Sequence, residues 1–220
     1  MHTVDLHLHR KKQAVREEVA NSVTHGIGTA LSIAGLVFLV VWASATHDAY
    51  KIVSLTAFGA SMVALYLAST LYHSFSAPKV KHFFRILDHA SIYLLIAGSY
   101  TPFALVSIRG PWGWTIFGVV WGIALVGVCF KMFFVAHFSA LSTILYLGMG
   151  WMALIAAKPI LMSVPMGGIG LLAAGGIMYT VGVAFYAWNS LPYNHAVWHL
   201  FVMAGTAFHF IAVSEFVLPA

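Results

Sequence analysis

Residues 194–217 read NHAVWHLFVMAGTAFHFIAVSEFV, and this stretch decides the fold class. It is long and apolar enough to cross the hydrocarbon core of a bilayer, which takes about 20 residues in a helix. His195, His199 and His209 lie within it, and its one acidic residue, Glu215, is expected to reach the far interface. The stretch therefore predicts a transmembrane helix that carries polar side chains at depths where such groups are rare.

The composition of the chain extends this prediction to the entire protein. Of its 220 residues, 61% are hydrophobic and 8% are charged, whereas a water-soluble surface needs roughly 25–35% charged residues. The net charge of +5 comes from Lys and Arg that lie between apolar runs, which is the pattern of membrane topology signals rather than of a nucleic-acid-binding surface. We expect a polytopic membrane protein with lipid as its environment and no nucleic-acid partner.

Seven apolar runs are each close to the length of a membrane span. They cover residues 21–44, 52–74, 86–106, 112–131, 138–156, 166–187 and 194–217. We predict an all-α bundle of seven transmembrane helices that forms a single domain over residues 21–217. Residues 1–20, which include a histidine-rich tract, are expected to form a disordered cytoplasmic tail. The fifth run is the shortest and contains three hydroxyl side chains, so it is the weakest of the seven.

The positive charges predict the orientation of the bundle. Eight of the eleven Lys and Arg lie in the tail, in the connection after the second run, or beside the connection after the fourth run. The connections on the opposite side hold three, Lys51, Arg109 and Lys158. Because cytoplasmic segments collect Lys and Arg, we expect the N-terminus in the cytoplasm and, with an odd number of spans, the C-terminus outside.

Four polar side chains fall at the cytoplasmic ends of their predicted spans. His73 ends the second span, Asp88 opens the third, and His195 and His199 open the seventh. His195 and His199 are four residues apart, so a helix presents both imidazoles on one face. Three imidazoles suit Zn²⁺ and leave the fourth tetrahedral position open for water or substrate, as in catalytic zinc sites. We therefore expect these three histidines to bind a zinc ion.

Two further residues are candidates for a catalytic role beside this ion. Asp88 could hold or deprotonate a water at the metal, or ligate the metal directly. Ser69 lies one turn before His73 and could hydrogen-bond to that water or to a substrate oxygen. The same residues are also compatible with ordinary structural roles, since a histidine at a membrane interface often has simple hydrogen-bond partners and Asp88 could cap the third helix.

Two other histidines are poorer ligand candidates. His89 follows Asp88 directly and so points about 100° away around the helix. His209 lies about 15 Å deeper than His199 by helix rise. A hydrogen bond to another helix is the expected role of His209.

Five short motifs of polar and aromatic residues occur along the chain. They are ExxNxxxH at Glu18, Asn21 and His25, SxxYH from Ser69 to His73, LDHxxIY from Leu87 to Tyr93, AGSYTPF from Ala97 to Phe103, and PYNHAVWHLFV from Pro192 to Val202. Together they resemble the hemolysin III family over nearly all of residues 17–215. This family is grouped with the progestin and adiponectin (PAQR) receptors and with alkaline ceramidases, seven-span membrane proteins that are regarded as metal-dependent hydrolases.

The resemblance implies a specific site and location. Zinc would be held by His73, His195 and His199, with Asp88 on the metal's water and Ser69 nearby. The protein would lie in the bacterial cytoplasmic (inner) membrane with its N-terminus in the cytoplasm. For the first motif, a role in helix capping or packing is at least as well supported as one in catalysis.

Two classes of function are compatible with these residues. The first is a ceramidase-like zinc hydrolase that acts on a lipid amide or ester, with membrane lipid as its substrate. The second is a receptor-like or membrane-stress protein whose zinc is structural and takes Asp88 as a fourth ligand. A lytic protein, as the family name suggests, would need a continuous polar lining, for which the spans supply few residues. The sequence specifies neither the substrate nor any protein partner.

Overall fold

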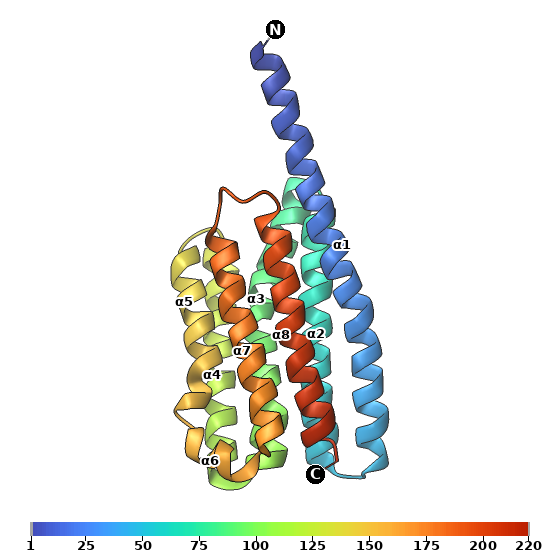
Figure 1. Ribbon diagram of the computed structural model, residues 1–220, viewed down its shortest axis with the longest axis vertical. Coiled ribbons are helices and arrows are strands. Elements are labelled where there is room, and N and C mark those ends of the chain that lie inside the picture. Colours follow the sequence, from blue (N-terminus) through green and yellow to red (C-terminus); the bar gives the residue numbers. More distant parts are fainter. Residues whose placement is uncertain (1, 220) are drawn as a thin grey trace.

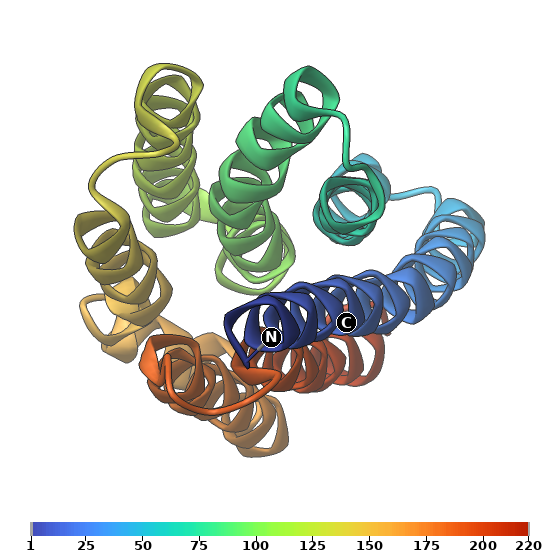
Figure 2. The ribbon, with the colours of Figure 1, turned by 90° about the horizontal axis from the view of Figure 1, so that it is seen from above.

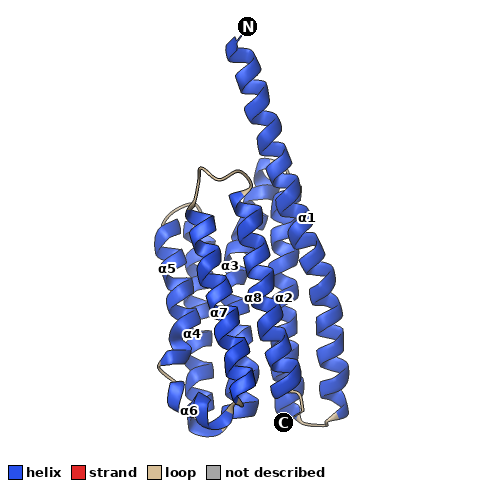
Figure 3. Cartoon of the chain, in the orientation of Figure 1, coloured by secondary structure: helices blue, strands red, loops and turns tan. Residues whose placement is uncertain are grey.

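Helices and short turns make up the described part of the structure, a computed structural model that covers residues 2–219, with side chains from residue 12 onward (Figure 3). The helices are α1 (His2–Ala45), α2 (Ala49–Ser74), α3 (Pro78–Pro102), the π-helix η1 (Phe103–Ile108), α4 (Gly110–Phe134), α5 (Ser139–Gly150), the 3₁₀ helix η2 (Trp151–Leu154), α6 (Ala157–Ser163), α7 (Met166–Ala187) and α8 (Asn194–Phe216). No strand occurs between residues 2 and 219. The all-α prediction is confirmed.

Six helical segments of the described chain are long and apolar enough to span a membrane. They are α1 from Lys12 onward, α2, α3 continued by η1, α4, α7 and α8. The remaining predicted span corresponds to α5 with η2 and to α6, which pass the same test only together, as a pair bent by 56° that is either a broken span or a re-entrant loop. The predicted multi-span bundle is therefore confirmed with six spans, or seven if the bent pair is one span.

Tyr100 of α3 binds backbone groups at the end of α5 and in η2, just before the bend to α6. The Tyr100 hydroxyl donates to the Gly150 carbonyl at 2.6 Å and accepts from the Ala153 amide at 2.9 Å. A side chain inserted in this way takes the place of helical backbone bonds and bends the helix. Gly148 and Gly150 also lower the helix propensity just before the break. The backbone groups freed by the bend thus have a partner inside the bundle, as the membrane interior requires.

The polar N-terminal segment is helical. α1 begins at His2, and its N-terminal part projects beyond the rest of the bundle (Figure 1). No Gly or Pro occurs before Gly26, and Lys, Arg, Gln and Glu are good helix formers, so the helix of the first span continues outward. The expectation of a disordered tail is therefore wrong for residues 2–20.

The helices pack closely where glycines face a neighbour. α2 lies between α1 and α3, and α8 contacts both α1 and α7 (Figure 2). A Cβ added at Gly175 of α7 would overlap the His209 ring of α8, and one at Gly28 of α1 would lie 2.8 Å from the Tyr66 ring of α2. These two glycines let their helices approach to a distance that a larger residue would prevent.

One end of the bundle gathers the predicted polar residues. α2 ends there, α3 and α8 begin there, and α1 projects from it, whereas the C-terminus lies at the opposite end (Figure 1). We call it the histidine end because it holds His73, His195 and His199.

Candidate metal centre

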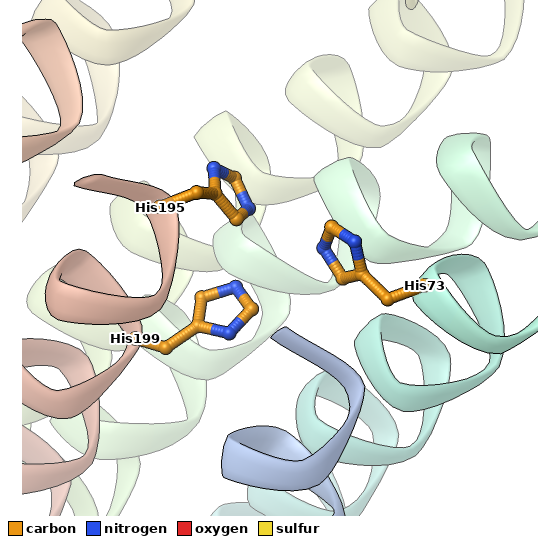
Figure 4. A group of neighbouring side chains, drawn as sticks. All are labelled: His73, His195 and His199. Carbon is orange, nitrogen blue, oxygen red and sulfur yellow. The ribbon is translucent and has the colours of Figure 1, made fainter. Parts of the chain in front are cut away.

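Three histidines converge at the histidine end from two helices. His73 lies in the last turn of α2, and His195 and His199 lie in the first two turns of α8. Their rings face one another in Figure 4, and one ligand nitrogen from each lies within 4.8 Å of the other two. The ring centroids are 4.6, 5.0 and 5.3 Å apart. His199 is fully buried, His73 is 7% exposed and His195 is partly exposed, so two of the three rings are shielded from solvent.

The unpaired nitrogens of this cluster fit metal coordination. The Nε2 atoms of His73, His195 and His199 are buried and have no hydrogen-bond partner within the described residues. Buried polar atoms without partners are rare, because each costs the free energy of desolvation. Three such lone pairs at one point are what a metal ion uses when it binds imidazoles at about 2.0–2.1 Å. The cluster could therefore bind a metal ion through Nε2 of each ring.

Hydrogen bonds from α1 set the tautomers of two of the rings. His73 Nδ1 lies 2.7 Å from Glu18 Oε2, a carboxylate oxygen that can only accept. His199 Nδ1 lies 3.1 Å from Thr24 Oγ1, whose own proton is directed to a backbone carbonyl of α1. Both Nδ1 atoms therefore carry the ring proton, which leaves each Nε2 with a free lone pair.

Glu18 is a site residue whose specific role the sequence alone does not indicate. Its second oxygen accepts from Lys81 Nζ at 3.0 Å, so it ties α1 to both α2 and α3. In the same motif, His25 stacks on His199 with ring centroids 3.4 Å apart. Capping is excluded for this motif because α1 begins at His2. The spacing of Glu18, Asn21 and His25 along one helix face was the available signal, but it does not reveal what that face contacts.

Asp88 and Ser69 lie beside the cluster. Asp88 is 5% exposed and lies well inside α3, which begins at Pro78, so the predicted alternative of an N-cap is wrong. Its carboxylate has His73 and Ser69 as neighbours. The Ser69 hydroxyl is buried beside this carboxylate. The ligand atoms that lie within 4.8 Å of one another come from the three histidines, and no carboxylate oxygen of residues 12–219 belongs to this group. Asp88 is therefore a neighbour of the predicted ligands rather than one of them.

The other polar candidates lie outside the cluster. His89 does not belong to the group of three ligand rings, and its Nδ1 is 3.7 Å from Asp88 Oδ2. His209 Nε2 donates to the Leu172 carbonyl of α7 at 3.2 Å, which confirms the predicted bond to another helix. Glu215 is exposed near the opposite end of the bundle.

An apolar cavity of about 480 Å³ opens beside the cluster. Asp88 and His195 line it at the histidine end. Its apolar lining comes from α2 to α8 and includes Leu65, Leu95, Ile96, Leu147, Leu172 and Val202. A volume in the range of about 300–1,000 Å³ with few polar groups is typical of a site for a small, largely apolar ligand.

Comparisons with known proteins identify the family of the chain. The chain is 50% identical over 210 residues to Hemolysin-3 of Bacillus cereus, which is 96% of each chain. It is 50% identical over 199 residues to the Hemolysin-3 homolog of Bacillus subtilis (strain 168), which is 90% of this chain and 93% of that protein. The human Monocyte to macrophage differentiation factor is 29% identical over 216 residues, 94% of this chain and 87% of the human protein. The family described as Haemolysin-III related matches residues 13–210. This chain therefore belongs to the hemolysin III family.

Proposed function

We propose that this membrane protein is a zinc-dependent hydrolase that cleaves an amide or ester bond of a lipid. One observation carries the proposal: three buried, unpaired Nε2 atoms converge beside the Asp88 carboxylate at the end of an apolar cavity. A zinc ion bound to three neutral imidazoles supplies a Lewis acid that acidifies water and polarises a carbonyl.

The side chains around the cluster divide the remaining tasks. Asp88 accepts the proton of the attacking water and returns it to the leaving group, since its carboxylate lines the cavity. Ser69, which is buried beside Asp88, donates a hydrogen bond to a substrate oxygen. The apolar walls hold the acyl chain and exclude bulk water from the polar link of the lipid.

The test of hydrolysis is a panel of lipid amides and esters given to the purified protein. Asp88→Asn is expected to keep the metal and to lower turnover by about 100-fold or more, the usual contribution of a general base. Asp48→Asn is the matched control, because Asp48 caps α2 at the opposite end and Asn caps a helix equally well. Full turnover in Asp88→Asn would rule out this role for Asp88.

We also propose that the histidine end faces the bacterial cytoplasm. The excess of Lys and Arg at this end supports that orientation, and the bacterial relatives support a cytoplasmic membrane location. In a Cys129→Ala background, Lys79→Cys should react with an impermeant thiol reagent only from inside, and Arg109→Cys only from outside. The reverse pattern would invert the topology.

A structural role for the metal is the second candidate. The bonds of Glu18 and Thr24 to ligand histidines join α1, α2 and α8 at this point, so an ion there would also hold the bundle together. This candidate predicts that Asp88→Asn loses metal, because the carboxylate would be the fourth ligand. A lytic function, which the name of the Bacillus relatives suggests, is less well supported because the cavity walls are mainly apolar.

A further inference from the structure

Two cations line the cavity near Asp88 and have no part in the proposed hydrolysis. They are Arg85, one turn before Asp88 on α3, and Lys131, in the last turn of α4. Each lies close enough to the other for their like charges to repel. Of the charged side chains that line the cavity, two are therefore cationic and one, Asp88, is acidic.

Neither cation forms a direct ion pair among the described residues, although Arg85 lies close enough to Asp88 for their opposite charges to attract. The ion pairs there join Glu18 with His73 and Lys81, Asp88 with His89, and Asp48 with Arg109. Arg85 Nε is buried without a hydrogen bond, and Lys131 is 2% exposed. Cations at the end of a membrane span that face a cavity instead of the solvent, and that lack a direct ion pair, are candidates for binding an anion.

The direction of Lys131 is unusual for a lysine at a helix end. Such a lysine usually extends outward to reach the lipid headgroups. Here the side chains that follow it, Met132, Phe133 and Phe134, are 58%, 77% and 44% exposed, while Lys131 is buried. The end of α4 thus turns apolar groups outward and its one charged residue inward, toward the cavity.

We propose that Arg85 and Lys131 form an anion subsite that binds the phosphate of an amphiphile whose chain occupies the apolar cavity. The planar guanidinium and the ammonium together match a phosphate, which offers several acceptor oxygens. The subsite deepens the proposed function, on which it rests, by selecting phosphate-bearing lipids as the substrate class. The scissile link of such a lipid lies between the headgroup at the two cations and the chain, beside Asp88 and His195.

The test measures equilibrium binding of two lipids to the purified protein. One is the hexadecyl ether of glycerol, and the other is the same ether with a phosphate on its glycerol. Each charge-assisted contact contributes about tenfold in affinity, so the phosphate should increase affinity by about 100-fold. Inorganic phosphate should bind far more weakly than the phosphate lipid, because it cannot use the cavity. Equal binding of the two ethers, or of inorganic phosphate and the phosphate lipid, would overturn the proposal.

Variants assign the effect to the two cations. Arg85→Gln and Lys131→Met should each reduce the advantage of the phosphate lipid about tenfold, and Arg85→Lys should restore part of it. Lys79→Gln removes a cation from an exposed position at the same end and should change nothing. Unchanged affinity for the neutral ether shows that the cavity of each variant is intact. A double variant that binds the neutral ether and keeps the full advantage would contradict the assignment.

This readout is separate from catalysis. The ether lipids contain no amide or ester, so a phosphate preference that depends on Arg85 and Lys131 supports the subsite even if no lipid is hydrolysed. If a variant no longer binds the neutral ether, the test of the subsite is the difference in affinity between the phosphate ether and the neutral ether in the unmodified protein.

Discussion

The carboxylate of Glu18 is predicted to control how tightly the cluster binds zinc, although it does not touch the metal position. It accepts from His73 Nδ1 at 2.7 Å and from Lys81 Nζ at 3.0 Å. Glu18→Ala removes the acceptor that fixes the His73 tautomer and frees that ring to rotate or to present a protonated Nε2. His195 and His199 would then bind the ion without a fixed third ligand from His73 of α2.

The magnitude follows from the geometry. Loss of a hydrogen-bond partner behind a metal ligand typically lowers metal affinity about 10- to 100-fold, or about 1.4–2.7 kcal/mol. The Glu18 side chain is 40% exposed, whereas that of His73 is 4% exposed. Because water can partly replace the lost acceptor, we expect the lower part of that range, about 10- to 30-fold. Competition with a zinc-chelating dye in detergent measures the dissociation constant directly.

Glu17→Ala is the matched control. It removes the same charge from the next position, and Glu17 contacts Gln13 and the Tyr193 amide rather than a ligand ring. We expect its zinc affinity to stay within about twofold of the unmodified protein. Equal zinc affinity in Glu18→Ala and Glu17→Ala would refute the idea that Glu18 orients His73.

Three further changes test other contacts. Thr24→Val removes the acceptor of His199 Nδ1 with little change in volume and should weaken zinc binding about 2- to 10-fold in the same titration, as expected for one neutral hydrogen bond. Tyr100→Phe leaves backbone groups unpaired at the end of α5 and should lower the free energy of unfolding by about 1–3 kcal/mol, measured by denaturation in mixed micelles. Its zinc affinity should stay unchanged, because Tyr100 lies about 18 Å along α3 from Asp88. Gly175→Ala places a methyl group against the His209 ring and should cost about 1–3 kcal/mol in the same assay; a stability equal to the unmodified protein would show that α7 and α8 can move apart freely.

Much of the site could be predicted from the sequence because it depends on helix spacing and membrane depth. His195 and His199 share a face since they are four residues apart, and span ends place His73 at the same level. The bond from His209 to a neighbouring helix also follows from its depth. These inferences need only that each apolar run is a helix.

The parts that could not be predicted depend on which helix faces which. The contact of Glu18 with His73 joins residues 55 positions apart, and the Gly150 carbonyl at the end of α5 binds a tyrosine 50 positions away. The sequence does not indicate that Lys131 faces inward, because α4 is apolar around its whole circumference and no polar stripe marks its inner face. The helical extension of α1 is not predictable from composition, because a polar segment can form either a solvated helix or a disordered tail.

The metal content of the purified protein tests the central claim most directly. Elemental analysis should find about one zinc per chain, and His73→Ala, His195→Ala and His199→Ala should each contain little or none, because two imidazoles bind zinc far more weakly than three. His89→Ala and His209→Ala should keep the metal, since neither ring belongs to the cluster. Size-exclusion profiles equal to that of the unmodified protein show that each variant is folded. Full zinc content in folded variants that lack His195 or His199 would contradict the account.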